Sequence, residues 1–430
     1  MHDLRFYLFT RSGYAELGFG SPESQAARDA YHQLMSIFGK FEAGSQTLEV
    51  SPVQRSSEDL NTAIAAFVDT YSKIEPRLNR LAKRLRDLTP GSHFLVLPRA
   101  PNSTAETLRL ETFLTVLDQG YIDEADLAEK FAAALREITG TFAPVLSQYN
   151  TFVYEPGARV VLGEPDKAKR VCRFCGKTSA RGAKFNKTAH AIPEALGNKD
   201  IVQLDECDDC NQEFGNTIEP HLIRFLDLPR VSQGVKGKSG APVVKYPNAT
   251  ILNHDGLFTI LAKRPQAEGG MPTILELGAV AGFVPQAAYK ALCKLALSVI
   301  RDEYLIGLED CVEWVSGRKS GVNALPKVAS NLFHADTGSP WHLMLYVRKS
   351  DSDPTLPHVV GEYRLGVYLY VFVLPYSRKD TKSFADEAFE TTFAGFPHYL
   401  ALPGWKLLDL SMNTGINLAP TLVFNRHDKP

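Results

Sequence analysis

The sequence predicts an α+β protein of several domains. A small zinc-stapled module is expected between a mainly helical N-terminal domain and an α+β C-terminal domain with an antiparallel sheet. Three observations predict this order: helical patterns in the first 150 residues, four cysteines in two C-x-x-C pairs, and later runs rich in aromatic and β-branched residues. A chain of 430 residues is too long for one core. We expect domains at 1–155, 164–229 and 245–430.

The N-terminal domain should contain short strands at 4–10 and 93–97. Helices are expected at about 23–41, 104–117 and 123–138. The last begins with an acidic turn, which suits the positive end of a helix dipole. This domain contains no grouping of residues that indicates a chemical role.

Apolar residues between Leu60 and Leu88 recur at alternating spacings of four and three, which is a heptad seam. Pro76 lies inside it and should kink or split the helix. Two interpretations remain open. The 60–88 seam could form a coiled-coil homodimer, or the helix could pack within its own domain, which the proline and the short length favour.

The central module is organised around Cys172-x-x-Cys175 and Cys207-x-x-Cys210. Two such knuckles can supply four thiolates to one tetrahedral zinc ion, with a structural role. The 31 residues between Cys175 and Cys207 exceed the spacing of an ordinary zinc ribbon. The excess is long enough for a β-hairpin that carries His190.

A run of basic residues without an acid extends from Lys167 to Lys187, although the formal net charge of the chain is −2. Such a local run can dock a phosphate backbone, whereas the overall charge argues against nonspecific coating of nucleic acid. A solvated surface with alternating charge blocks is the alternative. The residues that we expect to contact nucleic acid are Lys167, Arg170, Arg181, Lys184 and Lys187.

The C-terminal domain is expected to follow a Gly- and Lys-rich connector at 233–242. Asp255-Gly256 between two apolar runs indicates a hairpin. Pro285 should begin a helix that ends near 301. Further strands are expected at 341–347, 358–364, 367–374 and 406–410.

These central motifs resemble the HNH (ββα-metal) nucleases. The resemblance lies in Cys172-x-x-Cys175, His190-Ala-Ile-Pro-Glu194 with the following Leu-Gly-Asn198, and Glu206-Cys207-x-x-Cys210-Asn211. It covers roughly 50 residues and implies a ββα-metal fold. It also implies that His190 is the general base and that Asn211 holds a catalytic divalent cation, Mg2+ or Mn2+. Asn198 would orient the base.

Relatives of this kind often carry an acidic metal ligand directly before the histidine, where this chain has Ala189. Hard cations prefer anionic oxygens, so another carboxylate should replace it. Glu219 is the preferred replacement, because it lies about two helical turns beyond Asn211; Glu194 and Glu206 are the alternatives. Asn211 could instead be a simple helix N-cap.

The resemblance implies a metal-dependent endonuclease that acts on nucleic acid, with DNA favoured over RNA. The alternative is a catalytically inactive, zinc-stabilised module that binds nucleic acid or a partner protein, and Ala189 favours it. We expect a cytoplasmic protein, because no signal peptide or membrane span is evident. Cys293 and Cys311 are expected to be buried thiols.

Overall fold

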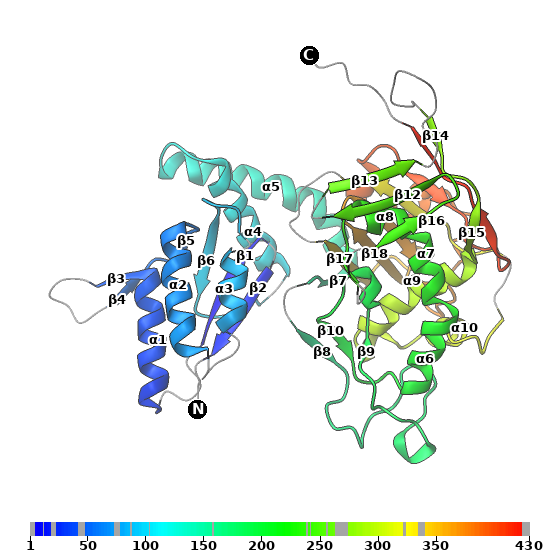
Figure 1. Ribbon diagram of the computed structural model, residues 1–430, viewed down its shortest axis with the longest axis horizontal. Helices are drawn as coiled ribbons and strands as arrows, with labels where there is room; N and C mark the ends of the chain where they lie inside the picture. Colours follow the sequence, from blue (N-terminus) through cyan, green and yellow to red (C-terminus); the bar gives the residue numbers. More distant parts are fainter. Residues whose placement is uncertain are drawn as a thin grey trace. The chain divides into compact units, whose positions relative to one another are not determined.

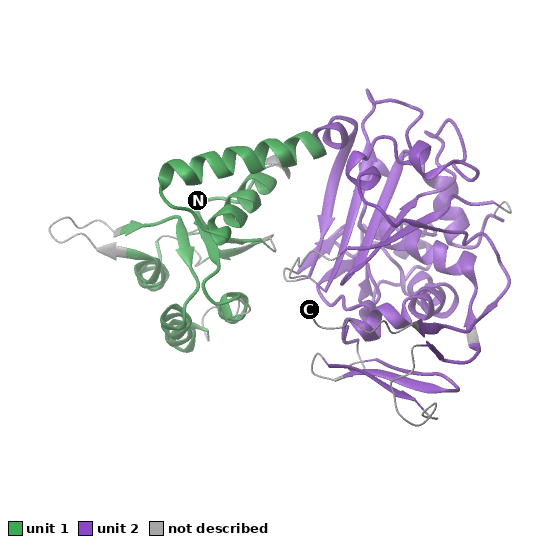
Figure 2. Ribbon diagram, turned by 90° about the horizontal axis from the view of Figure 1, so that it is seen from above, with its two compact units in different colours: residues 1–141 green, residues 142–430 purple. Residues whose placement is uncertain are grey.

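The computed structural model has a mixed α+β fold with several antiparallel sheets (Figure 1). It divides into two compact units, residues 1–141 and 142–430 (Figure 2). The division falls inside one helix. The structure describes residues 5–11, 13–18, 23–41, 48–72, 78–86, 88–102, 104–156, 159–237, 240, 242–254, 257–262, 274–320, 324–333 and 340–423.

Unit 1 is built on a four-stranded sheet in the order β2-β1-β6-β5. The side chains of β1 alternate between its two faces, as the period of a strand requires. Phe6 and Leu8 pack with the first three helices, whereas Phe9 packs with α4. The elements are β1 (Arg5–Thr10), β2 (Gly13–Gly18), α1 (Gln25–Phe38), β3 (Gly39–Phe41), β4 (Leu48–Val50), β5 (Val53–Arg55), α2 (Glu58–Tyr71), α3 (Leu78–Arg86), β6 (His93–Leu97) and α4 (Thr104–Gln119).

The expected heptad seam forms part of the core of unit 1. It is divided between α2 and α3, and residues 73–77, with Pro76, lie outside the described residues. Ile64, Phe67, Leu81 and Leu85 are at most 2% exposed and pack against the sheet. The seam therefore packs within its own unit, and a dimer through it would require this core to open.

Helix α5 (Glu124–Gln148) is longer than predicted. It runs through Gly140 and Pro144 to the start of β7 (Tyr149–Tyr154), whereas the sequence predicted an end near 138. Val145 is fully buried in the core under the main sheet of unit 2. Tertiary packing thus outweighs the poor helix propensity of glycine and proline.

Unit 2 contains a six-stranded antiparallel sheet in the order β20-β16-β19-β18-β17-β7. Its predicted strands are present within one or two residues at each end. The remaining edge strand, β7, comes from before the central cysteines. The other strands are β16 (Val328–Leu332), β17 (Trp341–Arg348), β18 (Val359–Leu365), β19 (Tyr368–Val373) and β20 (Lys406–Leu408).

One face of this sheet covers α9 (Pro285–Val299), which is buried along nearly its whole length. Pro285 occupies the first turn, where its missing N–H is not needed. The same hydrophobic core includes Phe174, Ile192 and Phe214 of the central segment. The segment expected as a separate domain at 164–229 therefore shares one core with the C-terminal sheet.

The central segment has a ββα arrangement. A three-stranded sheet has the order β8-β10-β9, with β9 antiparallel and β8 parallel to β10. Helix α6 follows this sheet, and Cys207 is its N-cap. The elements are β8 (Val160–Leu162), β9 (Ala189–His190), β10 (Ile201–Gln203), α6 (Asp208–Thr217), α7 (Glu219–Phe225) and α8 (Asp227–Ser232).

The predicted hairpin after the connector is present as the antiparallel pair of β12 and β13, in a sheet with β11. Its Asp255-Gly256 turn, and part of the connector, lie outside the described residues. Small sheets β14-β22 and β15-β21 follow. The remaining elements are β11 (Val243–Lys245), β12 (Ala249–His254), β13 (Leu257–Ala262), β14 (Ile274–Glu276), β15 (Val280–Phe283), α10 (Glu309–Val315), α11 (Phe389–Thr392), α12 (Pro397–Leu400), β21 (Ile416–Leu418) and β22 (Thr421–Val423).

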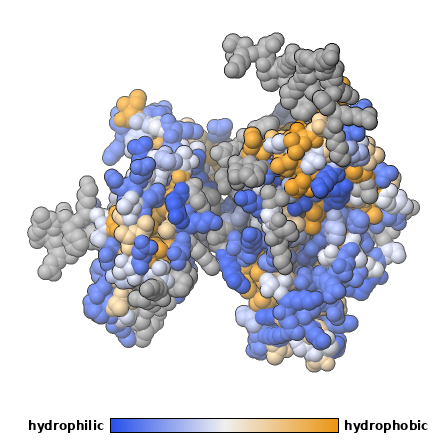
Figure 3. All heavy atoms as spheres, in the orientation of Figure 1, coloured by the Kyte–Doolittle hydropathy of each residue, from blue (hydrophilic) through white to orange (hydrophobic). Residues whose placement is uncertain are grey.

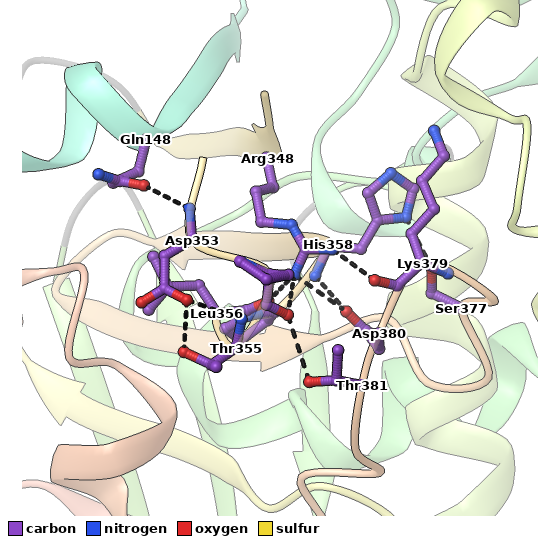
Figure 4. Close-up of polar contacts among 12 residues, drawn as sticks. Gln148, Arg348, Asp353, Thr355, Leu356, His358, Ser377, Lys379, Asp380 and Thr381 are labelled. Carbon is purple, nitrogen blue, oxygen red and sulfur yellow. Dashed lines mark hydrogen bonds and ion pairs between the residues drawn. The ribbon is translucent and has the colours of Figure 1, made fainter. Parts of the chain in front are cut away.

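A buried polar network fixes the loops beyond β17 and β19 (Figure 4). The Asp380 carboxylate accepts the His358 amide at 2.6 Å, and His358 Nδ1 lies 2.7 Å from the Ser377 hydroxyl. Arg348 donates to the carbonyls of Leu356 and Lys379. Burial lowers the pKa of His358 to about 3, so the ring is neutral and the network is structural.

Cys293 and Cys311 are fully buried free thiols, as predicted. Among the helices that the structure describes, none is long and apolar enough to cross a membrane.

Candidate metal centre and nuclease site

The four central cysteines converge on one point. Their sulfurs all lie within 4.8 Å of one another, with Cys172 Sγ 3.8 Å from Cys210 Sγ and Cys175 Sγ 3.7 Å from Cys207 Sγ. A tetrahedron with Zn–S bonds of about 2.3 Å has S···S edges of roughly 3.8 Å. The spacing therefore fits a four-cysteine zinc site, and these thiols are not joined in disulfides.

Backbone geometry supports the first knuckle. The Cys207 amide donates to Cys172 Sγ at 3.4 Å, and the Cys172 amide donates to the Lys177 carbonyl at 2.9 Å. Gly176 has a φ of 70°, which an L side chain rarely adopts, and its amide closes the turn on the Cys172 carbonyl. Zinc bound here would join this turn to the start of α6.

His190 lies at the end of β9, opposite Val202 of β10. Its Nε2 is 2.8 Å from Glu194 Oε1, and the two side chains are 21% and 33% exposed. Its Nδ1 is buried and has no hydrogen-bond partner among the described residues. Nε2 is therefore the ring nitrogen that has a polar partner, the Glu194 carboxylate.

Asn198 is buried and makes four hydrogen bonds that close the segment after His190. Its side-chain nitrogen donates to the carbonyls of Ile192 and Ile201, at 2.8 and 3.0 Å. Its oxygen accepts the amides of Asp200 and Ile201, at 3.0 and 2.9 Å. Asn198 thus connects the chain beyond His190 to the strand that pairs with it.

Asn211 is the fourth residue of α6, half-buried beside the zinc cysteines. The alternative that it is the helix N-cap is wrong, because the helix begins at Asp208 with Cys207 as the cap. Its side chain has no hydrogen bond to any residue that the structure describes, so its amide oxygen can act as a ligand.

Lys294 of α9 lies between two of the carboxylates proposed as metal ligands and contacts both. Its Nζ lies 3.2 Å from Glu206 Oε2 and 3.1 Å from Glu219 Oε1, and it donates to the His190 carbonyl at 3.3 Å. Glu206 is fully buried, and burial raises its pKa to about 7. Glu206 therefore cannot reach a solvated cation, whereas Glu219 is 15% exposed.

Residues 172–227 match the family model described as HNH endonuclease. These residues form an HNH domain. The match covers a small part of the 430-residue chain and includes all four cysteines, His190 and Asn211. No curated protein and no solved structure matches the chain.

The HNH domain contains one preformed group of metal ligands. Within the described part of the chain, the four cysteines alone bring three or more His, Cys, Asp or Glu ligand atoms together. His190, Glu194 and Glu219 do not form a second such group. Mg2+ in nucleases and polymerases commonly keeps waters and binds substrate phosphate, so one protein carboxylate and one amide can suffice.

The five basic residues expected to contact nucleic acid differ in their surroundings. Lys167, Arg181, Lys184 and Lys187 are exposed, and the visible face of the HNH domain in Figure 3 is largely hydrophilic. Arg170 instead donates to the carbonyls of Glu164 and Pro165, at 2.8 and 3.0 Å. The four exposed side chains can reach a phosphate backbone.

A cavity of about 670 Å³ in unit 2 contains none of the candidate site residues. It is lined by polar side chains that include Gln286, Lys290, Lys319, Asp409 and Asn413. This cavity and the candidate nuclease residues are therefore separate features of unit 2.

Two interactions at the site were not predicted from the sequence. Lys294 stands in the apolar run 291–300, and a lysine there needs a buried carboxylate, which is a usable signal. The contact of Glu194 with His190 is indicated less clearly by the sequence, only by their spacing of four residues.

Proposed function

We propose that the protein is a metal-dependent HNH endonuclease that hydrolyses phosphodiester bonds of nucleic acid, with DNA as the favoured substrate. The observation that carries the proposal is the location of His190. It lies within the matched HNH domain, in a side chain that is 21% exposed, with the Glu194 carboxylate next to Nε2. A general base must come within hydrogen-bond reach of the attacking water, and a partly exposed imidazole allows this.

In this proposal, His190 Nε2 accepts the proton of the water that attacks phosphorus. The attacking water would take the place that Glu194 Oε1 occupies beside Nε2. Asn198 maintains the path of the chain beyond His190, so the imidazole needs little reorganisation. Lys167, Arg181, Lys184 and Lys187 bind backbone phosphates by charge.

The catalytic cation, Mg2+ or Mn2+, would be held by Asn211 and Glu219, with Glu194 as the alternative carboxylate. Amide and carboxylate oxygens are the ligands that such hard cations take. A bound cation would neutralise charge on the phosphate and on the departing oxygen. Zinc on the four cysteines would stabilise the fold and take no part in the reaction.

The experiment is incubation of the purified, zinc-loaded protein with supercoiled plasmid, single-stranded DNA and RNA. Mg2+, Mn2+ and EDTA are compared, and His190→Ala is assayed beside the wild type. We expect cation-dependent cleavage that falls about 100-fold or more in His190→Ala, since a general base contributes about that much. His32→Ala, an exposed histidine on α1 of unit 1, is the matched control.

Cleavage that persists unchanged in His190→Ala would contradict the assigned base. The second candidate function is a nucleic-acid-binding domain that does not cut. It is favoured by Ala189, which is buried and offers no ligand, and by the pairing of Glu219 with Lys294. If the protein binds nucleic acid but does not cleave it with either Mg2+ or Mn2+, the result supports this second function.

A further inference from the structure

Lys294 is a fully buried ammonium group at the boundary of the HNH domain. It is bonded to three parts of that domain: Glu206 before the second knuckle, Glu219 at the start of α7, and the main chain of His190. The Lys294 ammonium donates a hydrogen bond to the His190 carbonyl and forms ion pairs with the two carboxylates. Its ammonium also lies 5.8 Å from the centre of the Phe214 ring.

The HNH domain also holds the end of α9 just beyond Lys294. Arg173 donates to the carbonyls of Leu297 and Ile300, at 2.6 and 3.0 Å. Gln203 donates to the Ser298 carbonyl at 2.8 Å. The last carbonyls of a helix lack partners within it, so these contacts satisfy groups that need them.

The position of Lys294 along α9 is fixed by these contacts, because it lies one helical turn before them. A buried ammonium is costly unless it is paired and hydrogen-bonded. A shift of His190 or Glu219 would therefore leave this buried ammonium with fewer partners.

We propose that Lys294 is a positioning residue of the nuclease site. It holds the His190 main chain and the Glu219 carboxylate in a fixed relation, from a helix outside residues 172–227. Because Lys294 is fully buried, it touches neither water nor substrate. The inference rests on the proposed function for its catalytic consequence, whereas its structural part can be tested without any cleavage.

The test uses the full-length, zinc-loaded protein. Lys294→Met alone would leave the fully buried Glu206 and the partly buried Glu219 without a counter-charge, and the variant can simply fail to fold. The informative variant is therefore the pair Glu206→Gln with Lys294→Met, compared with Glu206→Gln as the matched reference. The reference keeps the contacts of Lys294 with Glu219 and His190.

We expect both proteins to bind one zinc ion and to fold. Relative to the reference, the double variant should lose about 10- to 100-fold in kcat, with KM for the oligonucleotide unchanged, because misplacement by about 1 Å has this effect. A purely stabilising lysine would change none of these values in a folded protein.

Amide hydrogen exchange separates this inference from the proposed function. In the double variant, segments 187–196 and 217–222 should exchange faster than in the reference, whether or not any nucleic acid is cut. Equal exchange in the two proteins would overturn the inference. Equal kcat in two active proteins would also overturn it. Absence of cleavage by the wild type, with the exchange difference present, would remove the nuclease and leave the positioning role.

Discussion

The zinc site and the proposed catalytic site lie in the same domain and differ in how their ligands are held. The four cysteine sulfurs already face one another at tetrahedral spacing. His190 and Glu219 instead face protein partners, Glu194 and Lys294. A structural metal needs all its ligands from the protein, whereas a catalytic cation shares its coordination with substrate and water. In this domain, the site whose ligands already lie together is therefore the one suited to a structural metal.

The largest expected effect comes from breaking the preformed site. Cys207→Ser should abolish zinc binding and the cooperative unfolding of unit 2. Structural zinc sites bind with apparent free energies of about 10–16 kcal/mol, which matches or exceeds the stability of a whole domain, about 5–15 kcal/mol. Elemental analysis and calorimetry are the measurements. Cys293→Ala, also a buried cysteine, should lose some stability but keep one zinc per chain.

The second effect concerns the ligand that is not preformed. Glu219→Gln should raise the Mn2+ concentration needed for half-maximal cleavage by about 10- to 100-fold, a typical cost of disturbing a metal site. Zinc content should not change, and this would separate the two metals. Glu213→Gln, an exposed residue on α6, is the control. If both variants respond alike, Glu219 is not a ligand.

The third effect is a loss of stability at low pH that comes from His398 and not from zinc. The two causes must be measured separately, because acid also protonates the cysteine thiolates and so releases zinc. Burial lowers the pKa of His398 to about 4, and neither ring nitrogen has a partner among the described residues. An unfolded chain takes up this proton near pH 6.5, so the histidine reduces stability as pH falls from about 6.5 to about 4. Below about pH 4 the contribution of His398 to the free energy of unfolding no longer changes with pH.

His398→Phe removes this titration and keeps an aromatic ring between Phe142 and Tyr399. The free energy of unfolding of the variant, minus that of the wild type, should rise by about 1.4 kcal/mol for each unit by which the pH falls between about 6.5 and about 4. Chemical denaturation at several pH values, with zinc content checked at each, measures it. A difference that does not depend on pH would contradict the expected shift.

The smallest effect concerns the exposed lysines. Lys184→Ala and Lys187→Ala should each weaken binding to any sequence alike and reduce the salt dependence of the binding constant by about one ion. Fluorescence anisotropy at increasing salt measures both. Lys327→Ala, exposed in the same unit outside the basic run, should leave the slope unchanged. If the salt dependence of the binding constant does not change in Lys184→Ala and Lys187→Ala, these lysines belong to a solvated surface that does not contact nucleic acid.

Local patterns predicted much of this molecule. The C-x-x-C spacing identified the cysteines that converge, and alternation of apolar residues identified β17, β18 and β19 within two residues. Pro285 marked the first turn of α9. Each of these features is set by residues close in sequence, where strand periodicity, proline chemistry and turn geometry act directly.

The remaining features depend on contacts between distant segments. Arg173 belongs to the basic run, yet it binds the end of α9 more than 120 residues later. The partners of Lys294 lie 75 or more residues before it. Helix α5 continues past Gly140 because Val145, in its last turns, is buried under a sheet that is formed mostly by later residues. No local pattern encodes which distant surface a side chain will meet.

The edge position of β7 has a consequence for synthesis of the chain. Val153 pairs with Met344, about 190 residues later, so this strand leaves the ribosome long before its neighbour exists. At about 5–20 residues per second, the wait is on the order of 10–40 s. Helix α9 also emerges well after the cysteine knuckles. A nascent HNH domain can therefore collect zinc while it still lacks Lys294, and a chain interrupted before α9 would lack the contacts that order His190.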